Sequence, residues 1–418
     1  MKSLKILGWP AGVLAALAVC SLPYGVQAAG PVEQPAVEYR VLEPIASGNL
    51  LLFPVVRAGG APLRETPFLT LDEGIASGEV EVTEAGRLRG LVRPRPIVRW
   101  QPGDNGSLRA IPEGPLDRPQ RNDQVNTLVL VNHSKKPLLL LAGEIVTGGK
   151  QDRVIAKDRI VPAGSEPIDL GVFCIEPGRW TEQTALFGTS NQGAGKSLMV
   201  QPSVRERAMV QKDQQQVWDS VHGAIGRVAS VGMPAHGAMN QAGNAAPRTF
   251  ATTSYAQVMQ ESTVSAEVDK AAAPGIEGGV QVLEKLRAEH AVGVVVAIRG
   301  EIVWADLFAS TELLAHYWTK LVRSYAAESL TAAPGLGNVT TTDAQQFLNA
   351  PASGTEQSEG VVGVYRYLEL RSGRTERFVL ESLLPGARYE VHISKLRLRQ
   401  QELRKVHMLP LQREFIFR

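Results

Sequence analysis

Cysteine is almost absent from this sequence, whose 418 residues contain only Cys20 and Cys174. Cys20 lies in an apolar N-terminal segment, so Cys174 stands alone in the rest of the chain and an internal disulfide is excluded there. The seven histidines are scattered, and none forms the paired spacing of a helical metal motif. We therefore expect no metal ligands, and an apolar core has to stabilise the fold.

The sequence also lacks an excess of either charge. Lys and Arg number 44 against 42 Asp and Glu, which gives a formal net charge of +2. Binding to nucleic acids requires clustered positive charge. The balanced composition therefore predicts no nucleic-acid partner.

Long hydrophobic runs are missing beyond the N-terminus. Two lysines precede an apolar run over residues 6–22, and residues 26–28 supply the small side chains that signal peptidase requires. This pattern predicts a signal peptide over 1–28 and a mature protein that is periplasmic or extracellular. No later run is apolar enough to cross a bilayer, so no transmembrane segment is expected after cleavage. Two alternatives stay open: an uncleaved membrane anchor, and a lipoprotein acylated at Cys20.

Hydrophobic patterning divides the remaining chain into β-rich and helical parts. Short apolar or alternating runs between Gly and Pro signals predict a sandwich-like β core over 41–180. One-sided apolar spacing predicts helices over 203–290, and a β-hairpin followed by a helix over 291–330. The sequence thus predicts an α+β domain over 41–330, a polar linker over 331–360 and a β-rich accessory unit over 361–418.

Several local signals predict individual elements. Thr70 and Ser254 are expected to be N-caps of helices, Ser254 with the spacing of a capping box. A helix is expected to begin near Ser203, with Val210 and Val217 on its apolar face. The polar run 132–136 between two apolar runs is typical of a β-hairpin turn.

Glycines and charges crowd together in the run Gly148-Gly149-Lys150-Gln151-Asp152-Arg153. Adjacent glycines let the backbone approach a ligand, and Lys150 with Arg153 could bind phosphate or carboxylate. Glu144, just before the run, could polarise a water or a hydroxyl. The alternative is a β-hairpin whose two glycines adopt positive φ while the charges are solvated.

A second candidate group follows at the end of the next predicted strand, and it contains Cys174, Glu176, Arg179 and Trp180. An activated cysteine needs an adjacent base or a positive environment, and no partner is evident, which favours a buried inert thiol. Glu176 could pair with Arg153 or Arg179, and Trp180 could cover either arginine. We expect this group to lie beside the glycine run.

Two further features have plainer explanations. Residues 193–197 resemble a phosphate-binding loop, but no apolar strand precedes them and Pro202 cuts off the helix that should follow. Asp306, at the end of a predicted strand, could face a cleft; the plainer accounts are that it caps the next helix or pairs with Lys320.

Two blocks of the sequence resemble a known family. The first covers residues 143–180 and includes Gly143-Glu144, the glycine run and Gly178-Arg179-Trp180; the second covers 294–325 and includes Asp306-Leu307-Phe308, Trp318 and Ser324-Tyr325. Together they resemble the ADP-ribosylglycohydrolase- and rhodanese-phosphatase-associated protein domain, a bacterial family of unknown function, over roughly 41–330. The resemblance implies association with proteins that process ADP-ribose or phosphoryl groups, and it implies no chemistry for this chain.

The sequence therefore predicts an exported binding or interaction module, because it contains no nucleophile–base pair and no metal cluster. Its partner is expected to be a small anionic ligand or an envelope protein, and no cofactor is indicated. The alternative is a hydrolase for a phosphorylated or ADP-ribosyl-like substrate, which requires the charged groups to converge on one pocket. The candidate ligand-binding residues are Glu144, Lys150, Gln151, Arg153, Glu176, Arg179 and Trp180.

Overall fold

The structure is a computed structural model that describes residues 38–58, 67–87, 98–102, 108–112, 126–189, 198–229, 231, 250–276, 279–331, 337–351 and 354–398. The expected signal peptide and residues 193–197 lie outside these ranges. No described helix is long and apolar enough to span a membrane. The fold is α+β with a β-rich core, as predicted.

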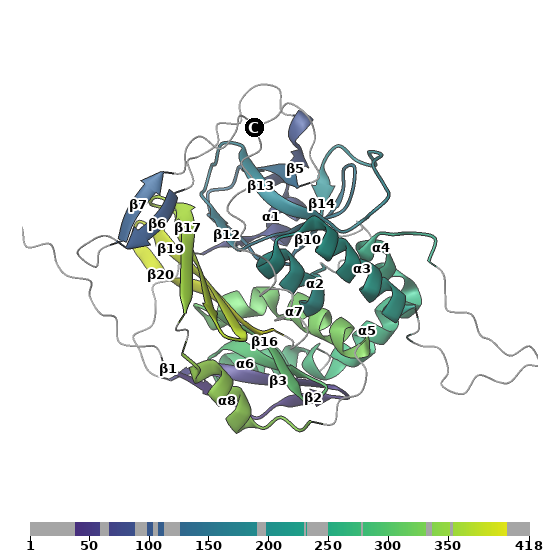
Figure 1. The fold of residues 1–418 in the computed structure, drawn as a ribbon, viewed down its shortest axis with the longest axis vertical. Coiled ribbons are helices and arrows are strands. Elements are labelled where there is room, and N and C mark those ends of the chain that lie inside the picture. The colour runs from purple at the N-terminus through teal and green to yellow at the C-terminus, as the bar shows by residue number, and fades with distance from the viewer. Residues whose placement is uncertain are drawn as a thin grey trace, which may run out of the picture. The chain divides into compact units, whose positions relative to one another are not determined.

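One antiparallel sheet collects strands from both ends of the chain. Within the described residues it has eleven strands, in the order β1-β3-β15-β16-β20-β19-β18-β17-β6-β7, with β2 pairing to β3 (Figure 1). The strands are β1 (Glu38–Val41), β2 (Ile45–Ser47), β3 (Leu50–Ala58), β6 (Val98–Pro102), β7 (Leu108–Pro112), β15 (Ala291–Ile298), β16 (Glu301–Phe308), β17 (Thr355–Val361), β18 (Tyr365–Ser372), β19 (Thr375–Leu384) and β20 (Ala387–Arg397).

This pairing differs from the predicted division into a domain and an accessory unit. Strand β20 hydrogen-bonds directly to β16, with Asp306 opposite Ser394. The C-terminal strands therefore continue the sheet that the predicted hairpin begins. Sequence periodicity could not reveal this, because it reports the faces of a strand and not its neighbours.

Two smaller sheets contain the glycine run and its surroundings. In the described chain, six strands follow the order β14-β10-β11-β13-β8-β5 and three follow β12-β9-β4. The strands are β4 (Leu69–Thr70), β5 (Val80–Glu84), β8 (Thr127–Asn132), β9 (Leu138–Leu140), β10 (Ile145–Gly148), β11 (Arg153–Ile155), β12 (Arg159–Val161), β13 (Ile168–Cys174) and β14 (Phe187–Gly188).

Helix α7 (Thr311–Thr331) joins the large sheet to the smaller ones. It packs on β15 and β3, while its Tyr317 hydroxyl donates to the Leu139 carbonyl of β9 at 3.0 Å. Its Trp318 indole donates to the Gly275 carbonyl at 2.8 Å. The other helices are α1 (Leu71–Ser77), α2 (Pro202–Glu206), α3 (Gln214–Val228), α4 (Tyr255–Gln260), α5 (Ser262–Ile276), α6 (Gly279–Ala288) and α8 (Thr341–Asn349).

Strand β15 is buried along its whole length because helices cover both faces of the sheet. Val294 and Val296 join the apolar cluster on the α7 side, whereas Val295 and Ala297 join the cluster that contains Phe347 of α8. Alternate residues of a strand point to opposite faces, which explains this division. The hairpin of β15 and β16 turns at Arg299 and Gly300, both with positive φ, as the sequence predicts.

The two helix N-caps predicted from the sequence, Thr70 and Ser254, were correct. Thr70 caps α1 in a capping box, in which its side chain accepts from the Glu73 amide while Glu73 accepts from the Thr70 amide. The Ser254 side chain caps α4 by accepting from the Gln257 amide. The helix predicted from Ser203 is instead broken into α2, a π-helical turn and α3. Lys212 adopts a positive φ at the break, and Asp213 caps α3.

The predicted hairpin turn at 132–136 was wrong. Strand β8 pairs with β13 and β5, while β9 pairs with β12 and β4. Asn132 supports this arrangement, because its buried side-chain amide donates to the Lys136 carbonyl at 2.9 Å and to the Pro162 carbonyl at 3.0 Å. These bonds tie the chain to a segment that a hairpin would leave free.

The segment predicted as a linker contains helix α8, which begins with a capping box at Thr340. Its Gln345 side chain accepts from the Val41 amide at 2.8 Å and donates to the Tyr39 carbonyl at 2.9 Å. The amide of Gln345 therefore satisfies backbone groups on strand β1, which lies at the edge of the large sheet.

Gln345→Ala should lower the free energy of unfolding by about 1–2 kcal/mol, because it leaves the two backbone groups of β1 without these partners. Gln346→Ala is the matched control, since its side chain is exposed on the same helix. Urea unfolding followed by circular dichroism measures both variants. Equal stability of the two variants would show that the Gln345 contacts contribute nothing.

Candidate functional site

The glycine run forms the turn between β10 and β11, which pair antiparallel. Gly148 and Gly149 have φ values of +114° and +50°. A Cβ on Gly148 would lie 2.3 Å from the Thr184 hydroxyl, and one on Gly149 would lie 2.1 Å from the Phe187 ring. Both positions therefore require glycine for conformation and for space. The hairpin interpretation predicted the positive φ of the two glycines correctly, but its solvated charges were wrong, because Asp152 and Arg153 are buried.

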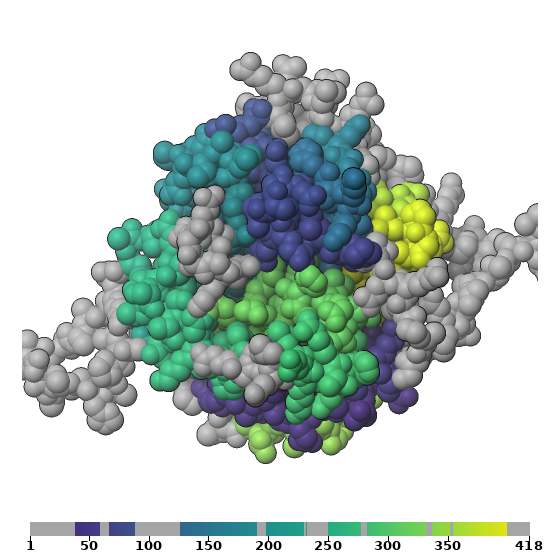
Figure 2. Space-filling view, turned by 180° about the vertical axis from the view of Figure 1, so that it is seen from behind, coloured from purple at the N-terminus to yellow at the C-terminus, as the bar shows by residue number. Residues whose placement is uncertain are grey.

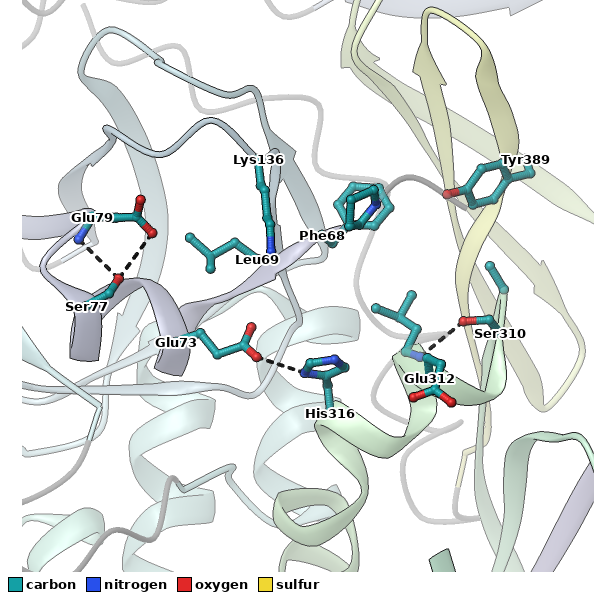
Figure 3. Close-up of a pocket in the computed structure, with 13 residues that line it drawn as sticks. Phe68, Leu69, Glu73, Ser77, Glu79, Lys136, Ser310, Glu312, His316 and Tyr389 are labelled. Carbon is teal, nitrogen blue, oxygen red and sulfur yellow. Dashed lines mark hydrogen bonds and ion pairs between the residues drawn. The ribbon is translucent and has the colours of Figure 1, made fainter. Parts of the chain in front are cut away.

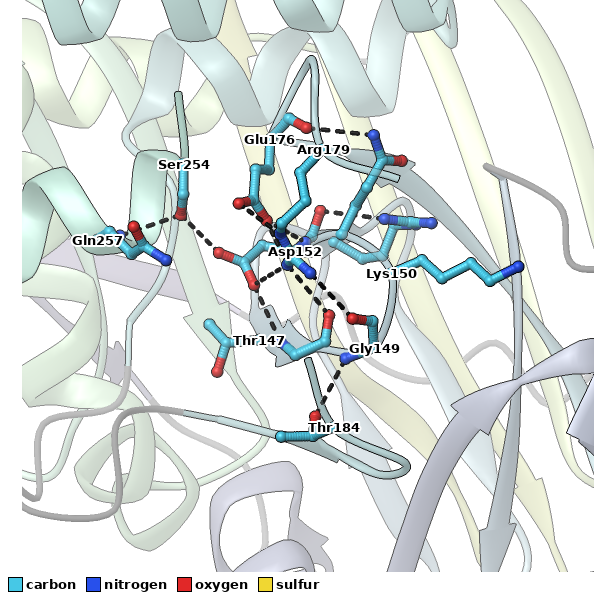
Figure 4. A network of polar contacts seen from close by, with 12 residues as sticks. Thr147, Gly149, Lys150, Asp152, Glu176, Arg179, Thr184, Ser254 and Gln257 are labelled. Carbon is cyan, nitrogen blue, oxygen red and sulfur yellow. Dashed lines mark hydrogen bonds and ion pairs between the residues drawn. The ribbon is translucent and has the colours of Figure 1, made fainter. Parts of the chain in front are cut away.

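Arg179 lies against this turn (Figure 4). Its guanidinium donates to the Gly149 carbonyl at 2.9 Å and to the Gly148 carbonyl at 3.4 Å. It also pairs with both carboxylate oxygens of Glu176, at 2.6 and 2.5 Å. The two groups that the sequence placed side by side do adjoin. The guanidinium of Arg179 is, however, already engaged by Glu176 and by the two turn carbonyls.

Asp152 connects the turn to helix α4. Its carboxylate accepts from the Gly148 amide at 2.9 Å and from the Ser254 hydroxyl at 2.5 Å. Burial raises the pKa of Asp152, although the bond from Ser254 opposes that change. Asp152 and Ser254 were absent from the predicted site residues. The helix-cap pattern identified Ser254, and only the tertiary structure reveals that it also bonds Asp152.

The amide of Asp152 and the side chain of Gln151 complete this polar network through their bonds to Glu176. Glu176 accepts from the Asp152 amide at 3.0 Å, and the Gln151 side chain donates to the Glu176 carbonyl at 3.2 Å. Each of these groups is buried. A buried polar network of this kind makes the turn rigid.

Lys150, Arg153 and Trp180 lie on another side of the turn. Trp180 is 45% exposed, with the Lys150 ammonium 5.1 Å and the Arg153 guanidinium carbon 5.9 Å from its ring centre. Arg153 is fully buried, 3.9 Å from Glu84, and burial lowers its pKa. Trp180 thus covers Arg153, as predicted.

The thiol of Cys174 is buried, and burial raises its pKa. Its sulfur accepts from the Glu176 amide at 3.3 Å. A thiol with a raised pKa is a poor nucleophile at neutral pH, so the structure agrees with the inert interpretation.

Glu144 does not join the other predicted residues. It precedes β10 at the end remote from the turn, and its carboxylate accepts from the Lys320 ammonium at 2.6 Å and the Leu141 amide at 2.7 Å. Lys320 also pairs with Asp72 at 2.5 Å. Burial raises the pKa of Glu144 despite the opposing charge of Lys320. Nearness in sequence misled the grouping, because a strand separates its two ends by several ångströms per pair of residues.

Asp306 has a different partner from those predicted. Arg205 of α2 binds its carboxylate through two nitrogens, at 2.8 and 3.0 Å. Ser394 and Tyr325 also donate to it, while His392 lies between Asp306, at 3.2 Å, and Asp158, at 2.6 Å. Ser310, and not Asp306, bonds the Leu313 amide in the first turn of α7. These buried groups fill the space that a cleft at Asp306 would need.

A cavity of about 410 Å³ opens beside the glycine turn. Gly148 and Asp152 belong to its wall, so the polar network forms one side of it. Among its described lining residues there is no lysine or arginine. The lining comprises Ile75, Gly78, Val80, Glu81, Thr147, Gly148, Asp152, Gln183, Thr184, Leu186, Phe187, Gly188, Ala256, Gln257 and Gln260.

The described residues contain no cluster of His, Cys, Asp or Glu suited to a metal ion. The model of the ARG and Rhodanese-Phosphatase-superfamily-associated Protein domain, ARPP-1, matches residues 38–396. No curated protein and no solved structure matches the chain. The matched range extends beyond the 41–330 of the predicted domain and includes β17–β20, in agreement with their place in the large sheet.

Arg179→Met should lower the free energy of unfolding by about 3 kcal/mol, because it leaves the buried Glu176 carboxylate without its cation. Arg87→Met is the control, since its pair with Glu182 is largely exposed and should contribute less than about 1 kcal/mol. Urea unfolding measures both. Wild-type stability in Arg179→Met would instead indicate that this arginine is free to serve a ligand.

The network around His392 predicts a dependence of stability on pH. Burial alone would lower the pKa of His392, but Asp158 and Asp306 raise it from 6.5 to about 9. The native state therefore keeps a proton that the unfolded chain loses above pH 6.5. Stability is full below that pH and declines as the pH rises toward 9.

Between about pH 6.5 and about pH 8, the free energy of unfolding of the wild type should fall by on the order of 2 kcal/mol because of this network. His392→Gln should remove this slope, while His133→Gln, an exposed control, should retain it. Denaturant unfolding at several pH values provides the measurement. The window ends where Lys395, whose pKa burial lowers to about 8, begins to contribute with the opposite sign. Parallel profiles for the wild type and His392→Gln would contradict the assignment.

Proposed function

Given that the chain belongs to the ARG and Rhodanese-Phosphatase-superfamily-associated Protein domain family, we propose that it is a binding module without catalytic chemistry. Its ligand occupies the cavity beside the glycine turn. The ligand is a small, neutral, hydroxyl-rich molecule such as a short glycan. The observation that carries this proposal is the composition of the cavity wall.

The wall offers hydrogen-bonding groups suited to hydroxyls. Gln183 and Gln257 provide side-chain amides that both donate and accept, and Thr147 provides a hydroxyl. Phe187 and other apolar residues supply a surface for the C–H face of a sugar. A volume of about 410 Å³ lies within the range of small-molecule sites.

The charges favour a neutral ligand over the anion that the sequence suggested. Glu81 and Asp152 contribute carboxylates to the wall, and no described lining residue is a lysine or arginine. Arg179, the nearest strong cation in the network, is engaged by Glu176 and by two carbonyls of the turn. An anion in this cavity would therefore face negative charge without compensation.

The way in which Glu144 and Glu176 are held supports a module without catalysis. Glu176 accepts from Arg179 and from the Asp152 amide, and Glu144 is buried against Lys320. Neither lines the cavity. A general base must reach the proton that it removes, and neither Glu144 nor Glu176, the two bases that the hydrolase alternative names, is positioned to do so in this cavity.

The site of action that we propose is the periplasm or the exterior of the cell. The basic and apolar N-terminus with its small-residue exit supports export. A glycan or polyol is an expected ligand in that compartment. An envelope protein as partner stays a prediction.

Gln257→Ala should weaken binding of a neutral disaccharide about tenfold, because one side-chain amide can contribute roughly 1.4 kcal/mol through two hydrogen bonds. The probes are N,N′-diacetylchitobiose and maltose, measured by saturation-transfer NMR and calorimetry. Gln346→Ala on α8 is the control and should bind as the wild type does.

Either of two kinds of result, in binding or in catalysis, would overturn the proposal. One is that neither disaccharide binds, or that Gln257→Ala binds as tightly as the control. The other is turnover of a phosphoester or an ADP-ribose conjugate that Glu144→Gln abolishes.

A further inference from the structure

The cavity beside the glycine turn has one helical wall that comes from α4. Ala256, Gln257 and Gln260 of this helix belong to its lining, and the remaining lining residues come from α1 to β5, from β10 with the glycine turn, and from the segment that ends in β14. Helix α4 contains only six residues. A helix of this length is not stable by itself, so its position depends on contacts with the rest of the chain.

Ser254, the N-cap of α4, bonds this helix to the turn. Its hydroxyl donates to the Asp152 carboxylate at 2.5 Å and accepts from the Gln257 amide at 3.1 Å (Figure 4). The other carboxylate oxygen of Asp152 accepts from the Gly148 amide at 2.9 Å. Hydrogen bonds therefore connect the turn to the backbone of Gln257 without a gap. Asp152 and Ser254 are both buried, which strengthens these bonds.

Tyr255 attaches the opposite side of α4 to the protein. Its amide donates to the Ile175 carbonyl at 3.2 Å, and its hydroxyl accepts from the Gln201 amide at 3.2 Å. Val258 and Met259 of the same helix are buried. Loss of the Ser254 bond therefore leaves α4 attached and changes its position relative to the turn.

Charged groups face Asp152 from each element that packs against it. Arg179 lies 3.6 Å away, and the charge of Arg153 on β11 also interacts with it; both favour the ionised carboxylate. Burial and the neighbouring Glu176 act in the other direction, and the pKa of Asp152 is raised. Asp152 is therefore protonated at a less acidic pH than an exposed aspartate. A protonated carboxyl is a weaker acceptor than a carboxylate.

We propose that Asp152 and Ser254 are positioning residues of this binding site, a role that rests on the proposed function. Their bond fixes α4 against the glycine turn and so presents the Gln257 side chain to the ligand. Ser254 is fully buried and does not line the cavity, so it acts through Gln257 and not by contact with the ligand. Acidification breaks the bond and weakens binding of the ligand.

The cavity between α1 and α7 provides a reference site in the same molecule. It measures about 460 Å³, and neither α4 nor any other wall of the first cavity lines it. In Figure 2 the dark blue atoms of residues 67–87 lie directly above the green helical region, and the cavity is lined from both sides. Figure 3 shows that its walls carry the charged side chains of Glu73, Glu79, Lys136, Glu312 and His316.

A double-mutant cycle tests the positioning role on the mature chain, with N,N′-diacetylchitobiose as the probe and calorimetry at about pH 7.5. Ser254→Ala should weaken binding about tenfold, as Gln257→Ala should, because both remove the contribution of one side-chain amide. The double variant should bind no more weakly than either single variant. Thr340→Ala, which removes the N-cap of the remote helix α8, is the matched control and should bind as the wild type does.

A pH profile separates positioning from general loss of stability. The wild type should bind several-fold more weakly at about pH 4.5 than at about pH 7.5, whereas Asp152→Asn should bind weakly and equally at both. His133→Gln removes the titrating neighbour of the lining residue Glu81 and should keep the wild-type profile. Amide NMR signals of Ser310 and Leu313, at the reference site, should not respond to the disaccharide.

Unchanged affinity in Ser254→Ala, or losses that add in the double variant, would overturn the positioning role and leave the proposed function standing. A wild-type profile in Asp152→Asn would also overturn it. If the wild type binds neither disaccharide, or binds at the reference site, the proposed function fails and this inference fails with it. Circular dichroism checks the folding of each variant, and Ser254→Gly, which suits an N-cap without a hydroxyl, replaces Ser254→Ala if that variant does not fold.

Discussion

Asp306 is fully buried, and the groups that neutralise it come from widely separated parts of the chain. Arg205 approaches from α2, Tyr325 from α7, and Ser394 and His392 from β20. Removing one member of such a network leaves an uncompensated charge in a medium of low polarity. The arrangement therefore fixes α2 and α7 against strands β16 and β20 of the large sheet. Arg205 further stacks on Trp304, 4.6 Å from its ring centre.

A second buried group, Lys320 with Glu144 and Asp72, links α7 to α1 and to the strand that leads into the glycine turn. Strand β10 is in this way held at both ends, because Lys320 pairs with Glu144 just before it and Arg179 donates to Gly149 just after it. Residues that look like a binding motif in the sequence are thus largely structural. Their charges are satisfied internally, and what they offer a ligand is a rigid wall.

Two cavities lie near α1. The one beside the turn is lined by hydroxyls, amides and carboxylates, whereas the one between α1 and α7 is lined by Lys136 and His316 together with the carboxylates of Glu73, Glu79 and Glu312. Both touch α1 or the strand after it.

The sequence by itself determined the features that depend on neighbouring residues. The cap at Thr70, the hairpin turn at Arg299-Gly300 and the positive φ of Gly148 and Gly149 all follow from local backbone chemistry. The α+β composition and helix α7 also follow, because apolar spacing reports which side of an element is buried.

Tertiary structure alone decided which elements are neighbours. Strand β20 lies beside β16, although more than eighty residues separate their paired positions in the sequence. Asn132 donates to a carbonyl thirty residues away and does not close a hairpin. Glu144 pairs with Lys320, 176 positions along the chain, and Asp306 pairs with Arg205, 101 positions away. Long-range pairing depends on strand order and on the shared burial of charges, and neither leaves a periodic trace in one sequence. That is why the sequence offered Arg179 as a partner of Glu176 but gave neither the distant partners of Glu144 and Asp306 nor the cavities.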